Sequence, residues 1–135
     1  MTIMNIKSAK QLVEEANKVI KKMSPLEVQD GLKNGEITLI DIRDIRELWK
    51  EGTIKNSIHI PRGMLEFWLD PSSPYFQEKK IKEIKKMVLF CGIGWRSALA
   101  TKALNEMGFE NAVNAEGGFE ALKSQGLEII SKDKQ

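Results

Sequence analysis

The sequence predicts an α/β domain built around a mainly parallel sheet, and two observations carry this prediction. Short apolar runs rich in β-branched residues alternate along the chain with longer stretches of helical periodicity. Such alternation is typical of parallel strands connected by helices. A chain of 135 residues, of which 41% are hydrophobic and 30% charged, is long enough for one well-packed domain but not for two.

The first two segments with a clear pattern are predicted helices. Residues 8–22 carry apolar side chains at helical spacing, with Ser8 available as the N-cap, so we expect an amphipathic helix leaning on the domain. The residues expected on its apolar face are Leu12, Ala16, Val19 and Ile20. A second short helix is expected after the cap Ser24, with Pro25 in its first turn and residues 31–35 as its stop region.

Two strands and an irregular segment are predicted next. Residues 37–42 form an almost continuous apolar run, which suits a strand buried on both faces. A short helix over 44–52, ended by a glycine, separates it from a short strand over 57–61 that closes with a proline. Residues 62–77 are rich in aromatic residues and proline, and we expect a loop that contains a helical turn.

The C-terminal half continues the alternation. The lysine-rich segment 78–86 is expected to form solvated surface. Further predicted elements are a buried strand over 87–90, an amphipathic helix over 96–108, a strand over 111–115 and a last helix over 117–126. We divide the chain into an N-terminal helical extension (1–22), the α/β domain (23–130) and a polar tail (131–135).

The composition argues against several classes of function. A formal net charge of +2 is too small to indicate nucleic-acid binding. One cysteine cannot form an internal disulfide, and neither cysteine nor histidine occurs at metal-ligand spacing. The first twenty residues contain lysine and glutamate and lack the uninterrupted apolar stretch of a signal peptide or membrane helix, so we expect a cytoplasmic protein.

The single cysteine, Cys91, stands between the apolar run 87–90 and a helix-like run, in the loop CGIGWR. Ligand sites of parallel α/β sheets lie beyond the carboxyl ends of the strands, which is where Cys91 falls. We expect Gly92 and Gly94 to adopt unusual dihedrals that turn successive N–H groups inward. Together with the helix N-terminus, Arg96 and Ser97, such a loop would favour a reactive thiolate over a small buried thiol.

Three segments, in order, resemble those of single-domain rhodaneses. CGIGWRS is similar to the rhodanese active-site loop, in which four residues separate a cysteine from an arginine. Residues 39–63 resemble the family's strand with Asp-x-Arg, a later glutamate and an Ile-Pro continuation, and residues 114–126 its closing Gly-Gly-aromatic segment. The chain departs from the family at Lys55–Ser57, where Pro-Gly-Ala is usual, and at Phe119, a place often held by tryptophan.

The resemblance implies a three-layer domain with a mainly parallel five-stranded sheet flanked by helices. It also implies sulfur transfer through a persulfide on Cys91, from a small anion such as thiosulfate to a thiophilic acceptor, either a protein or a small thiol. The active-site loop residues expected to bind substrate are Gly92, Ile93, Gly94, Trp95 and Arg96. No metal, organic cofactor, nucleic acid or membrane is implied.

Several nearby side chains are expected to support the loop. Asp41 and Arg43 follow an apolar strand near the same sheet end, so bracing the loop is expected of them, and Glu47 is expected to be structural. Arg96 suits either contact with the donor's sulfonate or an ion pair with Asp41 or Glu47. His59, just before the proline that ends its strand, is expected to make a structural hydrogen bond.

Two further questions stay open at the level of sequence. Trp95, with Met64, Phe67 and Trp68, could wall the pocket mouth, or the last three could simply fill the core. The chain could also be a sulfur carrier that barely turns over alone, or a cysteine phosphatase or arsenate reductase. Loops of those two enzymes place five residues between cysteine and arginine, whereas this chain has four.

Overall fold

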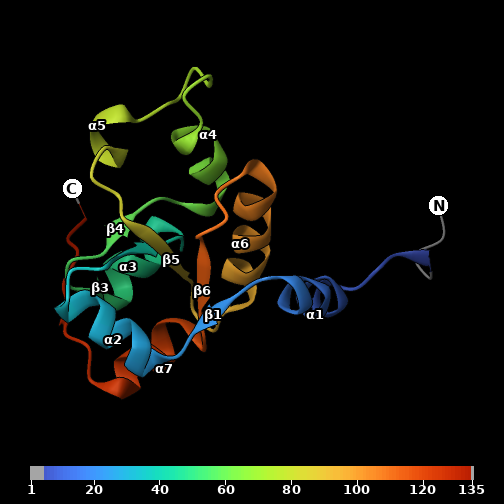
Figure 1. The fold of residues 1–135 in the computed structure, drawn as a ribbon. Coiled ribbons are helices and arrows are strands. Elements are labelled where there is room, and N and C mark those ends of the chain that lie inside the picture. The colour runs from blue at the N-terminus through green and yellow to red at the C-terminus, as the bar shows by residue number, and fades with distance from the viewer. Residues whose placement is uncertain (1–4, 135) are drawn as a thin grey trace.

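A five-stranded parallel sheet forms the centre of the molecule, with helices on both faces (Figure 1). The computed structural model describes residues 5–134. The strands lie in the order β1-β6-β5-β2-β4. Their bounds are β1 Lys22–Met23, β2 Ile37–Asp41, β4 Ile58–His59, β5 Lys86–Phe90 and β6 Val113–Ala115. This sheet confirms the predicted fold class and places β5, the strand that leads into Cys91, in the middle.

Helix α1 precedes β1, and the other helices lie in the connections between later strands. Their bounds are α1 Ala9–Val19, α2 Pro25–Lys33, α3 Ile45–Glu51, η2 Arg62–Met64, α4 Leu65–Leu69, α5 Glu78–Ile81, α6 Trp95–Met107 and α7 Gly118–Gln125. A small second sheet pairs β3 (Thr53–Ile54) antiparallel with β7 (Ile129–Ile130). Strands β1, β3 and β7 were not predicted, because two residues are too short to show a period of two. The equally short β4 was predicted because it lies in a longer apolar run that ends at Pro61.

Side-chain caps fix the starts of three helices. Ser8 accepts a hydrogen bond from the backbone N–H of Gln11 and begins α1, as predicted. Ser24 and Glu27 form a reciprocal capping box at the start of α2. Asp44 and Glu47 form the same arrangement at the start of α3, which holds the Glu47 side chain at the carboxyl end of β2. These caps set where each helix leaves the sheet.

The strand β5 alternates between two cores. Val88 and Phe90 pack in one apolar cluster with residues of α2 and α7. Met87, Leu89 and Cys91 pack in the other, which includes residues of α4 and α6. Because successive side chains of a strand point to opposite faces, this alternation directs the Cys91 side chain to the face covered by α6.

Helix α1 packs against α6 through Val13, Ala16 and Ile20. The predicted apolar face was therefore right for Ala16 and Ile20 but wrong for Leu12 and Val19, which are 43% and 67% exposed. The reason is that α1 lies at the side of the domain (Figure 1), where α6 covers only a narrow stripe of it. No described helix is long and apolar enough to cross a bilayer.

The divisions at 22/23 and 130/131 stay predictions, and residues 1–4 and 135 lie outside the described part of the chain. In the 62–77 segment, the expected helical turn is present as η2 and α4. Trp68 packs against the core cluster that contains Cys91, whereas Phe67 is 49% exposed and packs edge-on against Tyr75. Trp68 thus fills core, and Phe67 lies on the surface.

Candidate active site

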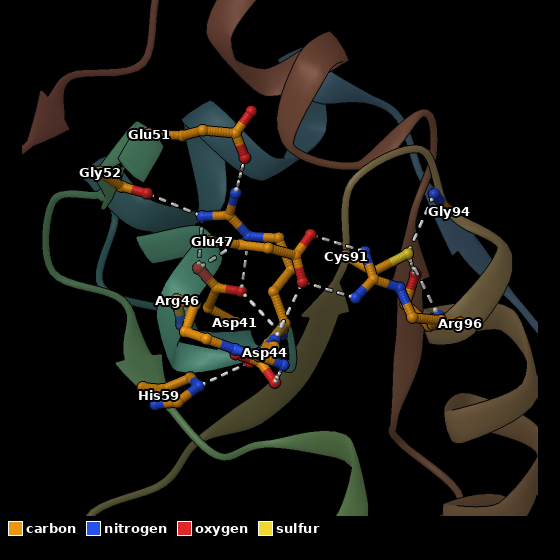
Figure 2. A network of polar contacts seen from close by, with 12 residues as sticks. Asp41, Asp44, Arg46, Glu47, Glu51, Gly52, His59, Cys91, Gly94 and Arg96 are labelled. Atoms are coloured by element: carbon orange, nitrogen blue, oxygen red, sulfur yellow. Dashed lines mark hydrogen bonds and ion pairs between the residues drawn. The ribbon is translucent and has the colours of Figure 1, made fainter. Parts of the chain in front are cut away.

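Cys91 follows the central strand directly, and its side chain is buried at the N-terminus of α6. Its Sγ accepts hydrogen bonds from the backbone N–H of Gly94 at 3.1 Å and of Ser97 at 3.4 Å (Figure 2). The Ser97 hydroxyl lies 3.4 Å from the same sulfur. The sulfur thus takes the place that a capping oxygen occupies at other helix starts, at the positive end of the helix dipole.

Only one of the two glycines in the loop has a backbone conformation that favours glycine. Gly94, the N-cap of α6, has a φ of 104°, in the left-handed region that favours glycine. Gly92 lies outside that region, so the expectation of unusual dihedrals at both glycines was wrong for Gly92. A Cβ on Gly92 would lie 3.4 Å from a guanidinium nitrogen of Arg96, which is an ordinary van der Waals contact, so neither space nor a positive φ requires glycine there.

The start of α7 holds the loop from outside. The N–H of Phe119 donates to the Cys91 carbonyl at 2.7 Å, and the N–H of Glu120 donates to the Gly92 carbonyl at 3.2 Å. Because a peptide unit points its C=O and N–H in opposite directions, these bonds turn the following N–H groups away from α7. Gly118 permits the approach, since a Cβ there would lie 2.6 Å from the Cys91 carbonyl oxygen.

Asn114 supports the loop from beneath. It is 3% exposed on β6, and its Nδ2 donates to the Gly94 carbonyl at 3.3 Å. Its Oδ1 is buried and has no partner among the described residues. Sequence reasoning named neither Asn114 nor Gly118 as site residues; the only signal was that both fall in the closing segment that resembles rhodaneses.

Arg96 is paired with Glu47 and not with Asp41. Its two terminal nitrogens donate to the two carboxylate oxygens at 2.8 and 3.0 Å (Figure 2). The hydrogen bond from Arg96 holds the pKa of Glu47 below its usual value, and the same bond raises the pKa of Arg96. The side chains are 45% and 33% exposed, so solvent reaches the pair.

Asp41 and Arg43 form a buried pair, both with fully buried side chains. Arg43 donates to Asp41 through Nε and Nη2, and also to the Gly52 carbonyl and to Glu51. Its guanidinium carbon lies 4.1 Å from the ring centroid of Phe119, whose N–H holds the Cys91 carbonyl. The pair therefore reaches the cysteine loop through α7.

Three other residues that were singled out from the sequence are His59, Ile93 and Trp95. A ring nitrogen of His59 lies 2.7 Å from the Arg43 carbonyl, the kind of structural hydrogen bond expected of it. Ile93 and Trp95, in the same loop as Cys91, are 63% and 45% exposed. In residues 5–134 no cluster of His, Cys, Asp and Glu side chains could hold a metal ion.

A separate cavity of about 400 Å³ lies between α5 and the end of α6, near the amino end of β5. Its lining includes Leu69, Met87 and Phe109 but not Cys91. The chemistry of the thiol is therefore confined to the opposite, carboxyl edge of the sheet.

Comparison with known proteins identifies the class to which this fold and loop belong. The profile of the rhodanese-like domain matches residues 24–125. A relative, the thiosulfate sulfurtransferase GlpE of Coxiella burnetii, is 30% identical over 104 residues, which cover 77% of this chain and 88% of the relative.

Two solved structures extend the comparison. The polysulfide-sulfur transferase homodimer of Wolinella succinogenes is 35% identical with a TM-score of 0.67, covering 91% of this chain and 87% of that one. A protein of unknown function from Rhodopseudomonas palustris, described as a possible tyrosine phosphatase, is 38% identical with a TM-score of 0.87, covering 96% and 99%. The chain belongs to the rhodanese-like family. Two of the relatives compared above are named as sulfurtransferases.

Proposed function

We propose that this protein transfers sulfane sulfur through a persulfide on Cys91, with thiosulfate or a related sulfur anion as donor. The observation that carries the proposal is the Cys91 sulfur itself, which accepts two backbone N–H bonds at the start of α6. The thiolate attacks the outer sulfur of thiosulfate, the S–S bond of the donor breaks, and sulfite leaves with the bonding electron pair. A nucleophile such as cyanide then takes the outer sulfur and regenerates the thiolate.

Further backbone N–H groups of the loop are available to bind the outer sulfur of the persulfide. The N–H groups of Ile93, Trp95 and Arg96 make no hydrogen bond among the described residues. Groups of this kind stabilise a charged terminal sulfur in the way an oxyanion hole stabilises oxygen. The names of two relatives support a sulfur-containing anion as donor: one is named for thiosulfate and another for polysulfide. The chemistry needs no metal or organic cofactor, and a cytoplasmic location stays a prediction.

The phosphatase alternative has one observation in its favour, the description of the Rhodopseudomonas palustris neighbour. Loop length argues against it here. Four residues lie between Cys91 and Arg96, and the N–H groups they carry suit one sulfur atom bound to the thiolate better than a tetrahedral oxyanion. The third reading, a carrier that does not turn over alone, uses the same persulfide and differs only in its acceptor.

The test is the substitution Cys91→Ser, which removes the sole thiol of the chain and changes the side-chain volume little. After incubation with thiosulfate, intact-protein mass spectrometry should show one added sulfur atom in the wild type and none in the variant. Thiocyanate formation from thiosulfate and cyanide should be lost together with it. The circular dichroism spectra of the two proteins should agree.

Two outcomes would count against the proposal. Sulfur transfer by a folded Cys91→Ser variant would show that the nucleophile is misassigned. Hydrolysis of an aryl phosphate by the wild type at a higher rate than thiocyanate formation would favour the phosphatase reading. A wild type that gains the sulfur atom but forms no thiocyanate would be a carrier.

A further inference from the structure

The only cation of the cysteine loop is already neutralised in this structure. Arg96 makes two charge-assisted hydrogen bonds to Glu47, at 2.8 and 3.0 Å, in the fork geometry that suits guanidinium and carboxylate. Figure 2 shows its guanidinium between the Glu47 carboxylate and the Cys91 sulfur. An anionic donor that approaches the sulfur therefore meets an arginine whose charge is balanced by Glu47 and two of whose five N–H groups are already bonded.

Glu47 is held in place independently of Arg96. Its Oε2 accepts the Asp44 N–H at 3.0 Å, and its own N–H donates to the Asp44 carbonyl at 2.9 Å. The carboxylate therefore stays at the mouth of the site when Arg96 moves away from it. The pKa of Glu47 lies below its usual value because of the bond from Arg96, so the group is ionised at neutral pH. A donor that captures Arg96 would leave this negative charge exposed beside it.

The neighbouring arginines offer no replacement. Arg43 is buried and bonded to Asp41, Glu51 and the Gly52 carbonyl. Arg46 is paired with the carboxylate of Asp44. A donor that binds at this edge of the sheet must thus compete with Glu47 for Arg96 or do without an arginine.

The rest of the mouth suits a donor with an apolar body. Ile93 and Trp95 belong to the same loop as Cys91 and are among the exposed large apolar side chains of the domain, at 63% and 45%. An aromatic ring attached to the sulfur-bearing group would cover part of this surface, a contact that thiosulfate does not offer. Charge and shape therefore both disfavour the small dianion relative to a larger monoanion.

We infer that Glu47 sets the donor preference of the proposed sulfurtransferase, by withholding Arg96 from dianionic donors such as thiosulfate in favour of singly charged donors with an apolar body. The inference rests on the proposed persulfide chemistry of Cys91. An aryl thiosulfonate is a donor of the favoured class: the thiolate takes its outer sulfur, the S–S bond breaks, and an aryl sulfinate leaves with the electron pair. Glu47 acts here as a positioning residue, through Arg96.

The experiment compares thiosulfate with benzenethiosulfonate, using cyanide as acceptor, in the wild type and in Glu47→Gln. Glutamine keeps the capping box of α3 but removes the charge that holds Arg96. The KM for thiosulfate should fall about fivefold, as expected for release of a solvent-exposed ion pair. The KM for benzenethiosulfonate should change less, and kcat should stay within about twofold for both donors. Glu116→Gln is the control, since Glu116 is exposed, directly follows β6 at the same sheet edge and forms no ion pair with any residue of 5–134.

A binding readout keeps the inference testable apart from turnover. Thiosulfate should protect Cys91 from iodoacetamide at lower concentration in Glu47→Gln than in the wild type. Glu47→Asp, which keeps the charge but shortens the reach to Arg96, should lie between the two and serves in place of the glutamine variant if that one misfolds.

The outcomes that would overturn this inference differ from the outcome that would refute the proposed function. A fall in kcat with both donors and an unchanged KM for thiosulfate would make Glu47 a brace of the loop and overturn the inference. Equal shifts in Glu47→Gln and Glu116→Gln would reduce the effect to general charge and overturn it as well. A wild type that transfers sulfur from neither donor would instead refute the proposed function.

Discussion

Two arginines lie at the same edge of the sheet and are used in opposite ways. Arg43, after β2, is fully buried and distributes its donors among Asp41, Glu51 and the Gly52 carbonyl. Arg96, after β5, is 45% exposed in its side chain and donates to a single carboxylate, that of Glu47. Both are ion-paired, but only the second pair is open to solvent and ligand.

The difference separates a residue that holds the fold from one that can exchange partners. A buried charge with all its donors satisfied is costly to disturb, because removal of one partner leaves the other uncompensated in a medium of low dielectric constant. An exposed ion pair exchanges with water and dissolved anions at little cost. Arg43 therefore holds the end of β2 to α7, on whose start the cysteine loop rests, whereas Arg96 lies in an exposed ion pair and a bound anion must compete with Glu47 for it.

The largest effect is expected from a substitution of the buried arginine, Arg43. Arg43→Met should lower the free energy of unfolding by about 3–5 kcal/mol, because Asp41 would remain as an unpaired buried charge. Arg96→Met should lower it by less than about 1 kcal/mol. Urea unfolding followed by circular dichroism measures both on one scale.

The rate of sulfur transfer should rank the two variants differently from their stability, when each is assayed under conditions where it is fully folded. Arg96→Met should raise the KM for thiosulfate, because the Glu47 carboxylate is left unpaired at the site, while its stability changes little; Arg43→Met should instead lose stability. Similar losses of stability in the two variants would mean that burial does not distinguish these arginines.

A smaller effect is expected where α7 supports the loop. Gly118 and Gly126 both have positive φ, at 63° and 101°, but a Cβ would lie 2.6 Å from the Cys91 carbonyl oxygen at the first and in open space at the second. Gly126→Ala should cost about 1–2 kcal/mol for the left-handed backbone alone. Gly118→Ala should cost about 1–3 kcal/mol more because of the added clash.

Sulfur transfer distinguishes the two alanine variants further. Gly118→Ala displaces the carbonyls that orient the loop, so its rate should fall well beyond that of Gly126→Ala at a temperature where both are folded. Equal stabilities and equal rates would show that the contact between α7 and the cysteine loop has no role in positioning the thiol.

The sequence predicted the elements whose signals are local. The caps Ser8 and Ser24, the strand over 37–42 and the position of Cys91 after β5 all follow from neighbouring residues, and the structure confirms them. It placed only Ala16 and Ile20 correctly on the packed face of α1, because that face is defined by contact with α6, roughly eighty residues further along the chain.

The parts of the site that sequence reasoning missed come from contacts between distant segments. Asn114 lies beneath the loop because β6 is the neighbour of β5, and its buried Oδ1 has no partner among the described residues. Gly118 matters because the start of α7 meets the Cys91 carbonyl. The choice between Asp41 and Glu47 as partner of Arg96 was open for the same reason: both follow β2, and only the tertiary structure shows that Arg43 already occupies Asp41.

The smallest expected effect is the pH dependence of the stability that the exposed pair of Arg96 and Glu47 contributes. Because its pKa is lowered in the folded protein, chiefly by the bond from Arg96, Glu47 contributes stability above its unfolded pKa and loses it as pH falls through the folded value. The difference in unfolding free energy between the wild type and Glu47→Gln should therefore vanish in acid and reach at most about 1 kcal/mol near neutral pH, since solvent screens the pair. Asp44, whose pKa is lowered to about 2 mainly by its hydrogen bonds from Arg46, stays ionised through most of this range, so the cap of α3 should not contribute to the change. Added salt should flatten the profile. A difference that persists unchanged into acid would mean that Glu47 stabilises the fold through its capping bonds alone, and that its pair with Arg96 contributes no stability of its own.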